Sequence, residues 1–314
     1  MNVSQRVLVT GAAGFIGQHL VRRLLEDGAQ VWAGIAPAEA PERVAQLPAD
    51  VRQISFDVRD TDAVRSAVAD VDPQIVFHLA AVGVTDTGVD PQLALIVNAG
   101  GAVNVLAALR GRDVKRVVLA GTCHEYGARE TSEGLDPLNA YAASKIAAWA
   151  FGRAFWRVHG LPVVTARLFQ VYGPGQPAHV LIPAAIRAAM DGRDFPMTQG
   201  DQARDFVYVA DVVDGLIAAA LASDLDGHSI DLGMGVPHTV RHVVERIWAL
   251  TEASGKIQAG VLPYRAGAVM SLIANADRTT RLTGWCAQLG LDDGLRAMVR
   301  YLSLIEGDGV DGRT

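Results

Sequence analysis

Short apolar runs alternate with amphipathic stretches through the first half of the chain. The runs are almost continuously apolar, which is typical of parallel strands that are covered on both faces. They predict buried strands at residues 6–10, 31–34, 75–79, 116–120 and 163–167, with a weaker candidate at 53–56.

The stretches between these runs have helical periodicity. A helix that begins near Phe15 places Ile16, Leu20 and Leu24 on one face and ends before Gly28, a normal stop signal. Longer helices are predicted at 91–110 and 140–159. The alternation of strand and helix predicts an α/β fold, a doubly wound parallel sheet with right-handed crossovers.

The pattern changes after about residue 171. Glycine and proline interrupt residues 172–177, and mixed helices and short strands follow. We therefore predict two intertwined regions. Residues 1–170 form the parallel sheet, and residues 171–314 form a smaller mixed α/β region.

Composition narrows the class of protein. The 314 residues are 50% hydrophobic and 20% charged, so the chain can bury a sizeable core. A formal net charge of −6 argues against a nucleic-acid partner. The N-terminal residues lack the pattern of a signal peptide, and no stretch reaches the roughly 18 apolar residues that cross a membrane. We expect no membrane association.

The cysteines and histidines exclude two further classes of site. The two cysteines, Cys123 and Cys286, cannot build a disulfide framework, so a reducing, cytoplasmic location is expected. The eight histidines have no ligand spacing, and no metal site is predicted.

Residues 10–17, TGAAGFIG, follow the first predicted strand and open the first helix. Gly11 allows a tight turn, Gly14 lets the backbone approach a pyrophosphate, and Gly17 lets the helix pack closely on the sheet. Free N–H groups at the helix start, at Phe15 and Ile16, then face the anion. The alternative is an ordinary glycine-rich turn, but the position at the first strand–helix junction predicts a Rossmann-type NAD(P)-binding domain over 1–170.

Tyr141 and Lys145 lie four residues apart on a predicted helix, so both side chains are on one face. A nearby ammonium is expected to lower the pKa of a tyrosine toward the range that suits general acid–base catalysis. Thr122, directly after the fifth predicted strand, is the hydroxyl candidate for bonding the reacting oxygen. A core tyrosine with a surface lysine is the alternative explanation.

These motifs resemble those of the extended short-chain dehydrogenase/reductases that act on nucleotide sugars. The GxxGxxG spacing, the YxxxK pair and the segment GTCHEYG (121–127) are joined by RLFQVYGP (167–174), RDFVYVADV (204–212), DLG (231–233), YRAG (264–267) and LTGW (282–285). The matches cover nearly the whole chain. The resemblance implies an NAD(P)-dependent oxidoreductase that acts at C4 of a nucleotide-diphosphate sugar.

The same resemblance assigns residues to the cofactor and to the substrate. Toward the cofactor it implies Asp57 and Val58 at the adenine, Leu79, Ala80 and Ala81 in the turn after the fourth strand, Asn98, and Leu168 at the nicotinamide amide. Toward the substrate it implies Arg204 and Arg265 at the diphosphate, Val180 in the segment 180–183 at the base, and Thr85 with Asp86 facing the sugar. Structural ion pairs are the alternative roles for the two arginines.

The resemblance also implies a homodimer built by the two longest helices. The helix at 140–159 is apolar nearly all round, with Ile146, Trp149, Phe151, Phe155 and Trp156.

The end of the second strand bears on the choice of cofactor. An acid there would bond the ribose 2′-OH of NAD, and an arginine would favour the 2′-phosphate of NADP. Residues 33–37 (AGIAP) hold neither, which favours NADP(H) over NAD(H), with Arg43 or Arg59 as candidate sources of charge.

Departures from the family pattern bear on the reaction. Cys123 and His124 stand where the 4,6-dehydratases of the family carry Asp and Glu, which argues against dehydration and, at His124, against decarboxylation. His124 and Gln170, which replaces an asparagine, are expected to contact the substrate. Glu125 resembles the ending of some 4-keto-6-deoxysugar reductases, unless it is simply a solvated glutamate.

Two enzyme hypotheses remain, and a third of another class. The absent acid and Glu125 favour an NDP-4-keto-6-deoxyhexose 4-reductase, and an NDP-hexose 4-epimerase is the alternative. A non-catalytic cofactor-sensing protein is the third, but such proteins often lose the tyrosine–lysine pair that this chain keeps.

Overall fold

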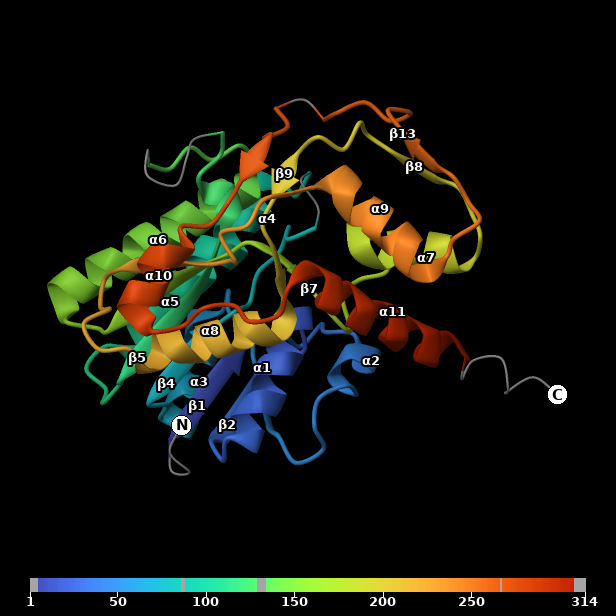
Figure 1. Ribbon diagram of the computed structural model, residues 1–314. Coiled ribbons are helices and arrows are strands. Elements are labelled where there is room, and N and C mark those ends of the chain that lie inside the picture. Colours follow the sequence, from blue (N-terminus) through green and yellow to red (C-terminus); the bar gives the residue numbers. More distant parts are fainter. Residues whose placement is uncertain (1–4, 86–87, 129–133, 266, 308–314) are drawn as a thin grey trace.

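The computed structural model describes residues 5–85, 88–128, 134–265 and 267–307. Its centre is a seven-stranded sheet in which every pair of neighbours is parallel (Figure 1). The strand order is β11 (Ser229–Leu232), β6 (Val163–Leu168), β5 (Arg116–Thr122), β4 (Ile75–His78), β1 (Arg6–Thr10), β2 (Gln30–Ile35) and β3 (Arg52–Ser55). The predicted fold class is confirmed, and all six predicted strands are present.

Helices cover both faces of this sheet. On one face, α1 (Phe15–Glu26) and α8 (Val209–Leu221) share a core with the strands, built from side chains such as Leu20 and Leu216. On the other face lie α3 (Thr61–Val71), α5 (Gly101–Leu109) and α6 (Ala140–His159), with Val68 and Leu106 in the second core. A short α2 (Pro41–Val44) follows β2.

The chain after residue 170 contributes to both parts of the molecule. It supplies α8 and the edge strand β11 to the large sheet. It also forms small sheets from β7 (Gln170–Tyr172) with β10 (Phe206–Tyr208), from β8 (Phe195–Met197) with β13 (Ile257–Ala259), and from β9 (Ala203–Arg204) with β12 (His238–Thr239) and β14 (Ser271–Leu272).

A third core joins α7 (Leu181–Met190), α9 (Val240–Thr251) and α11 (Leu291–Gly307), and α10 (Ala276–Thr283) packs beside β11. The return of β11 was not predicted, because four residues give too little pattern to separate a strand from a turn.

The helix predicted at 91–110 is interrupted by a wider turn. It consists of α4 (Pro91–Ala94), the π-helical segment η1 (Leu95–Gly100) and α5. With a mean hydropathy of 1.7 over 19 residues it is long and apolar enough to cross a membrane, contrary to the expectation from sequence. In this fold half of it is buried, against α6 and α3, as in the core helix of a globular protein.

The loop after β1 touches the turn after β4. Gly11 has a φ of +68°, and a Cβ there would lie 2.7 Å from the backbone nitrogen of Ala80. A Cβ at Gly17 would lie 2.3 Å from the carbonyl oxygen of Gly11. Only glycine fits these positions, so the first helix starts directly against the carboxyl edge of the sheet.

Candidate active site

The proton-transfer residues lie where β5 meets α6. The Asn139 side chain accepts a hydrogen bond from the Ala142 N–H at 2.8 Å and starts α6, so Tyr141 and Lys145 fall in its first two turns. Thr122 is the last residue of β5 and pairs in register with Leu168 of β6. Parallel strands thus bring the predicted site residues to one edge of the sheet.

Tyr141, Lys145 and Thr122 form one buried cluster. The exposed fractions of Tyr141 and Lys145 are 6% and 4%. The Lys145 ammonium donates a hydrogen bond to the Ala120 carbonyl at 2.9 Å and lies 5.9 Å from the centre of the Tyr141 ring. The Thr122 hydroxyl is hydrogen-bonded to the Tyr141 oxygen. The structure therefore brings together the three predicted catalytic residues.

The electrostatics of the pair differ from the expectation. Burial raises the pKa of Tyr141, with further increases from Glu125 and Cys123, while the bond with Thr122 acts the other way. Burial lowers the pKa of Lys145 to about 8, and Glu125 opposes this change. The expected lowering of the Tyr141 pKa by Lys145 is wrong for the protein alone, because loss of solvation of the phenolate outweighs the attraction.

The residues predicted at the cofactor line a continuous edge. Gly11, Gly14, Phe15, Ile16 and Gly17 form the turn and the first residues of α1, and Leu79, Ala80 and Ala81 follow β4 against that turn. This tight backbone cradle, which a Cβ would fill, fits a dinucleotide pyrophosphate.

Asp57 and Asn98 are held by neighbouring protein groups. The Asp57 carboxylate accepts hydrogen bonds from the Arg59 guanidinium at 2.6–3.0 Å, which lowers the pKa of Asp57, and Val58 beside it is buried. Asn98 is 1% exposed, and its amide bonds the backbone of Val82 and the Ser144 hydroxyl. Asn98 thus orders the loop after β4 and does not face the cofactor side directly.

An acid that the sequence analysis missed lies beyond the end of β2. Glu39 accepts a hydrogen-bonded ion pair from Arg43 at 2.9 Å, and the Arg43 guanidinium lies 3.7 Å from the position of a Cβ on Gly14. Glu39 also lines a cavity of about 670 Å³ between β2, α2 and β3. The i, i+4 spacing of Glu39 and Arg43 was the available signal. Arg59, by contrast, is engaged with Asp57.

Three predicted substrate residues meet in a small cavity. Gln170, Val180 and Arg204 line a space of about 120 Å³ between β7, β10 and the start of α7. The Arg204 guanidinium donates hydrogen bonds to the carbonyls of Ala203 and Val269, at 2.8 and 2.7 Å. Neither carboxylate considered as an ion-pair partner for Arg204 is seen bonded to it: Asp205 accepts three backbone N–H bonds instead.

The other substrate residues are more scattered. Thr85 and Arg265 are exposed in loops after β4 and β13, and neither lines this cavity. Asp86 lies outside the described residues. His124 is half-buried, and burial together with the positive charge of Arg204 lowers the pKa of His124.

The positions that replace the dehydratase carboxylates carry no charge near neutral pH. Burial raises the pKa of Cys123 to about 12, so its side chain is a thiol, as predicted for small packing. His124 is neutral for the reason just given. Among the described residues no group of three or more His, Cys, Asp or Glu side chains could hold a metal ion.

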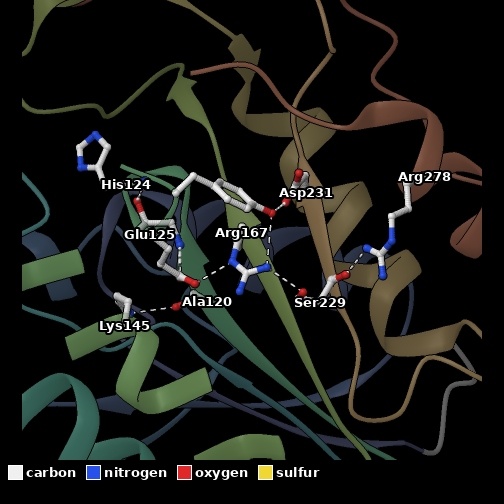
Figure 2. A network of polar contacts seen from close by, with 10 residues as sticks. Ala120, His124, Glu125, Lys145, Arg167, Ser229, Asp231 and Arg278 are labelled. Carbon is white, nitrogen blue, oxygen red and sulfur yellow. Dashed lines mark hydrogen bonds and ion pairs between the residues drawn. The ribbon is translucent and has the colours of Figure 1, made fainter. Parts of the chain in front are cut away.

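Glu125 is not a solvated glutamate. It is fully buried in η2 (Cys123–Glu125), a single 3₁₀ turn, and forms an ion pair with Arg167 at 2.6 Å (Figure 2). Its carboxylate therefore points into the protein and cannot contact a sugar in the small cavity.

Lys145 makes the stability of the protein depend on pH. Its pKa falls from 10.5 in the unfolded chain to about 8 in the fold, so the unfolded chain binds the extra proton between these values. The cost of burying the charge is full below about pH 8 and disappears as pH rises toward 10.5. Lys145→Met is expected to raise the free energy of unfolding by about 2 kcal/mol at neutral pH.

Urea denaturation measures this change. The gain should shrink at about pH 10, where both states lose the lysine proton. Exposed Lys115→Met is the control and should change stability by no more than about 0.5 kcal/mol at either pH. An equal gain at both pH values would contradict the assignment.

Comparison with known proteins agrees with this geometry. The chain is 30% identical to UDP-glucose 4-epimerase of Mycolicibacterium smegmatis, over 94% of this chain and 98% of that protein. It is 28% identical to UDP-N-acetyl-alpha-D-glucosaminuronate decarboxylase of Bacillus cytotoxicus, over 98% and 100% of the two chains. The structure superposes on that of Thermus thermophilus UDP-glucose 4-epimerase in complex with NAD with a TM-score of 0.83 at 29% identity, over 94% and 98% of the chains.

A family model gives the broader assignment. The model described as the NAD dependent epimerase/dehydratase family matches residues 7–233, which include the glycine-rich turn, Thr122, Tyr141, Lys145 and Arg204. The resemblance inferred from the sequence motifs is thereby confirmed, and the chain belongs to the NAD-dependent epimerase/dehydratase family of nucleotide-sugar enzymes.

Proposed function

We propose that the protein is a 4-epimerase of a nucleotide-diphosphate hexose that keeps its NAD between turnovers. The observation that carries the proposal is the buried cluster of Tyr141, Thr122 and Lys145, with Arg204 and Gln170 lining the neighbouring cavity. This cluster can move one proton at one sugar oxygen. Epimerisation by oxidation and reduction at C4 requires nothing more from the side chains.

The chain's own residues divide the work. A nicotinamide held by the glycine-rich turn and the loop after β4 supplies the hydride acceptor and donor, and its positive charge when oxidised favours ionisation of Tyr141. Tyr141 takes the proton of the C4 hydroxyl and later returns it. Thr122 hydrogen-bonds the same oxygen, Lys145 stabilises the phenolate, and Arg204 holds the diphosphate. Between the two transfers the keto sugar presents its other face.

Two sequence arguments for a reductase lose force in this fold. Glu125 is buried against Arg167 and does not face a substrate. The acid that seemed absent after β2 has a counterpart in Glu39, whose charge would repel a 2′-phosphate and suit the ribose hydroxyls of NAD. The NADP(H)-dependent 4-keto-6-deoxyhexose reductase remains the second candidate, favoured by Arg43 beside Gly14.

Dehydration and decarboxylation are less well served. One curated relative is a decarboxylase, but this chain has the Cys123 thiol and a neutral His124 at the two positions in question. Neither side chain supplies the carboxylate that the resemblance associates with those reactions.

The state of the cofactor distinguishes the two candidates. The purified protein, denatured without added nucleotide, should release about one equivalent of NAD per chain, identified by mass spectrometry. Incubation with UDP-hexoses should then interconvert the C4 epimers without added cofactor. A protein that is purified empty, binds NADPH more tightly than NADH and reduces a 4-keto-6-deoxysugar would overturn the epimerase in favour of the reductase.

Removing the Tyr141 hydroxyl tests the catalytic assignment and separates both enzymes from a cofactor-sensing protein. Tyr141→Phe should lower turnover by about a thousandfold, because general acid–base catalysis by that group is lost, while cofactor binding is retained. Tyr301→Phe on α11, far along the chain from the catalytic helix, is the control and should leave turnover unchanged. Unchanged turnover in Tyr141→Phe would sink the catalytic claim.

We also propose a homodimer built on α6 and the α4–η1 segment beside it. These elements pack together, and their outer sides expose apolar side chains that are 40–51% accessible on η1 and α4 and 47–72% on α6. The residues are Leu93, Leu95, Ile96, Phe151 and Val158. Exposed apolar side chains gathered on adjacent helices are typical of an interface between subunits.

A charge in this surface should separate the subunits. Light scattering at micromolar concentration should give twice the chain mass for the wild type and the chain mass for Phe151→Glu. Leu304→Glu, at an equally exposed apolar position on α11, is the control and should remain dimeric. A monomeric wild type would count against the dimer.

A further inference from the structure

Glu125 is fixed against the backbone of the catalytic strand. One carboxylate oxygen accepts a hydrogen bond from the Thr122 N–H at 2.9 Å, and the other accepts from Arg167 Nε at 2.6 Å. A Cβ on Gly121 would lie 2.6 Å from the first oxygen. Glycine at 121 therefore gives the carboxylate room to reach the peptide that carries Thr122.

A polar network behind Glu125 holds Arg167 in place. Arg167 Nη1 donates to the Ser229 hydroxyl at 2.7 Å, and the Tyr126 hydroxyl donates to Asp231 at 2.7 Å (Figure 2). The Arg167 guanidinium also stacks over the ring of Trp149, one turn after Lys145 on α6, at 5.5 Å. The network thus ties η2, β6, β11 and the catalytic helix together.

Stability alone does not account for this arrangement. A buried ion pair costs nearly as much in desolvation as it returns in attraction, and apolar residues of similar volume are often as stable. The Glu125–Arg167 pair is buried on both sides, with side-chain exposures of 0% and 5%. The position of the charge is therefore the more informative feature.

We infer that Glu125 is a positioning residue for proton transfer: it fixes the Thr122 peptide and places one negative charge beside Tyr141 and Lys145. This inference rests on the proposed role of that pair. It assigns to the buried carboxylate a task that does not involve contact with the substrate.

The surroundings of the pair contain few other charges. Ionisable groups face it from η2 (Glu125 and Cys123) and from β4 (His78), and Arg167 of β6 stands on the far side of Glu125 in Figure 2. The segments α4, η1 and α5 that pack against α6 carry no ionisable residue. Cys123 is a thiol, and burial lowers the pKa of His78 to about 3, so His78 is neutral. Glu125 is thus the negative charge that keeps the buried Lys145 protonated near neutral pH.

The test reads the Lys145 proton directly. The chain has three lysines, Lys115, Lys145 and Lys256, so lysine labelled with ¹³C at the ε carbon gives few NMR signals. The Lys145 signal is assigned by its loss in Lys145→Met. Glu125→Gln keeps the shape and removes the charge, and the Lys145 titration midpoint should fall by about one pH unit.

Two control variants separate charge from structure. Asp231→Asn removes an equally buried carboxylate at the other end of the network, and it should leave the Lys145 midpoint in place. Glu125→Asp keeps the charge but shortens the reach to Thr122, so turnover should fall while the midpoint stays near that of the wild type. An unmoved midpoint in Glu125→Gln, or an equal shift in Asp231→Asn, would overturn the inference.

A folding defect does not block the test. If Glu125→Gln does not fold, the double variant with Arg167→Met leaves no unpaired buried charge, and the downward shift should persist. The pH profile of turnover should move in the same direction as the midpoint. Failure of the proposed function is recognised separately, because it appears as unchanged turnover in Tyr141→Phe, whereas failure of this inference appears in the lysine titration.

Discussion

The site depends on the parallel register of the central strands. Thr122 at the end of β5 pairs with Leu168 at the end of β6, which pairs in turn with Leu232 of β11. In a parallel sheet all strands leave the same edge, so three loops from distant parts of the sequence begin side by side. The glycine-rich turn after β1 and the turn after β4 arrive at this edge for the same reason. Every contact of the active site is built on that convergence.

Converging loops exclude water, and this decides how the polar groups behave. Lys145, Tyr141 and Glu125 are all nearly or fully buried, and each is held by a specific partner: the Ala120 carbonyl, the Thr122 hydroxyl and the Arg167 guanidinium. Burial raises the pKa of the phenol and lowers that of the ammonium. The protein alone therefore holds Tyr141 as a neutral phenol, and added positive charge is needed before it can act as a base. Buried groups of this kind reduce stability and are typical of functional sites.

The same scaffold supports several reactions, and a few positions around the cluster distinguish them. Cys123 and His124 remove the charges that elimination would use, while Tyr141, Thr122 and Lys145 remain. Glu39 and Arg43 place opposite charges near the adenosine end of the glycine-rich turn. The chemistry at C4 is thus set by the shared cluster, and the choice between a retained and an exchanged cofactor depends on groups at the other end of the cleft.

Sequence alone determined the features that depend on residues close together in the chain. The apolar runs identified the strands, the glycine spacing identified the phosphate turn, and the i, i+4 spacing placed Tyr141 and Lys145 on one helical face. The tertiary structure decided what depends on neighbours far away in sequence. Burial of Glu125 follows from Arg167, 42 residues later, and the return of β11 follows from pairing with β6. The direction of the Tyr141 pKa shift follows from the dry environment that all these elements create together, because the cost of burying a charge is a property of its surroundings and not of the motif that carries it.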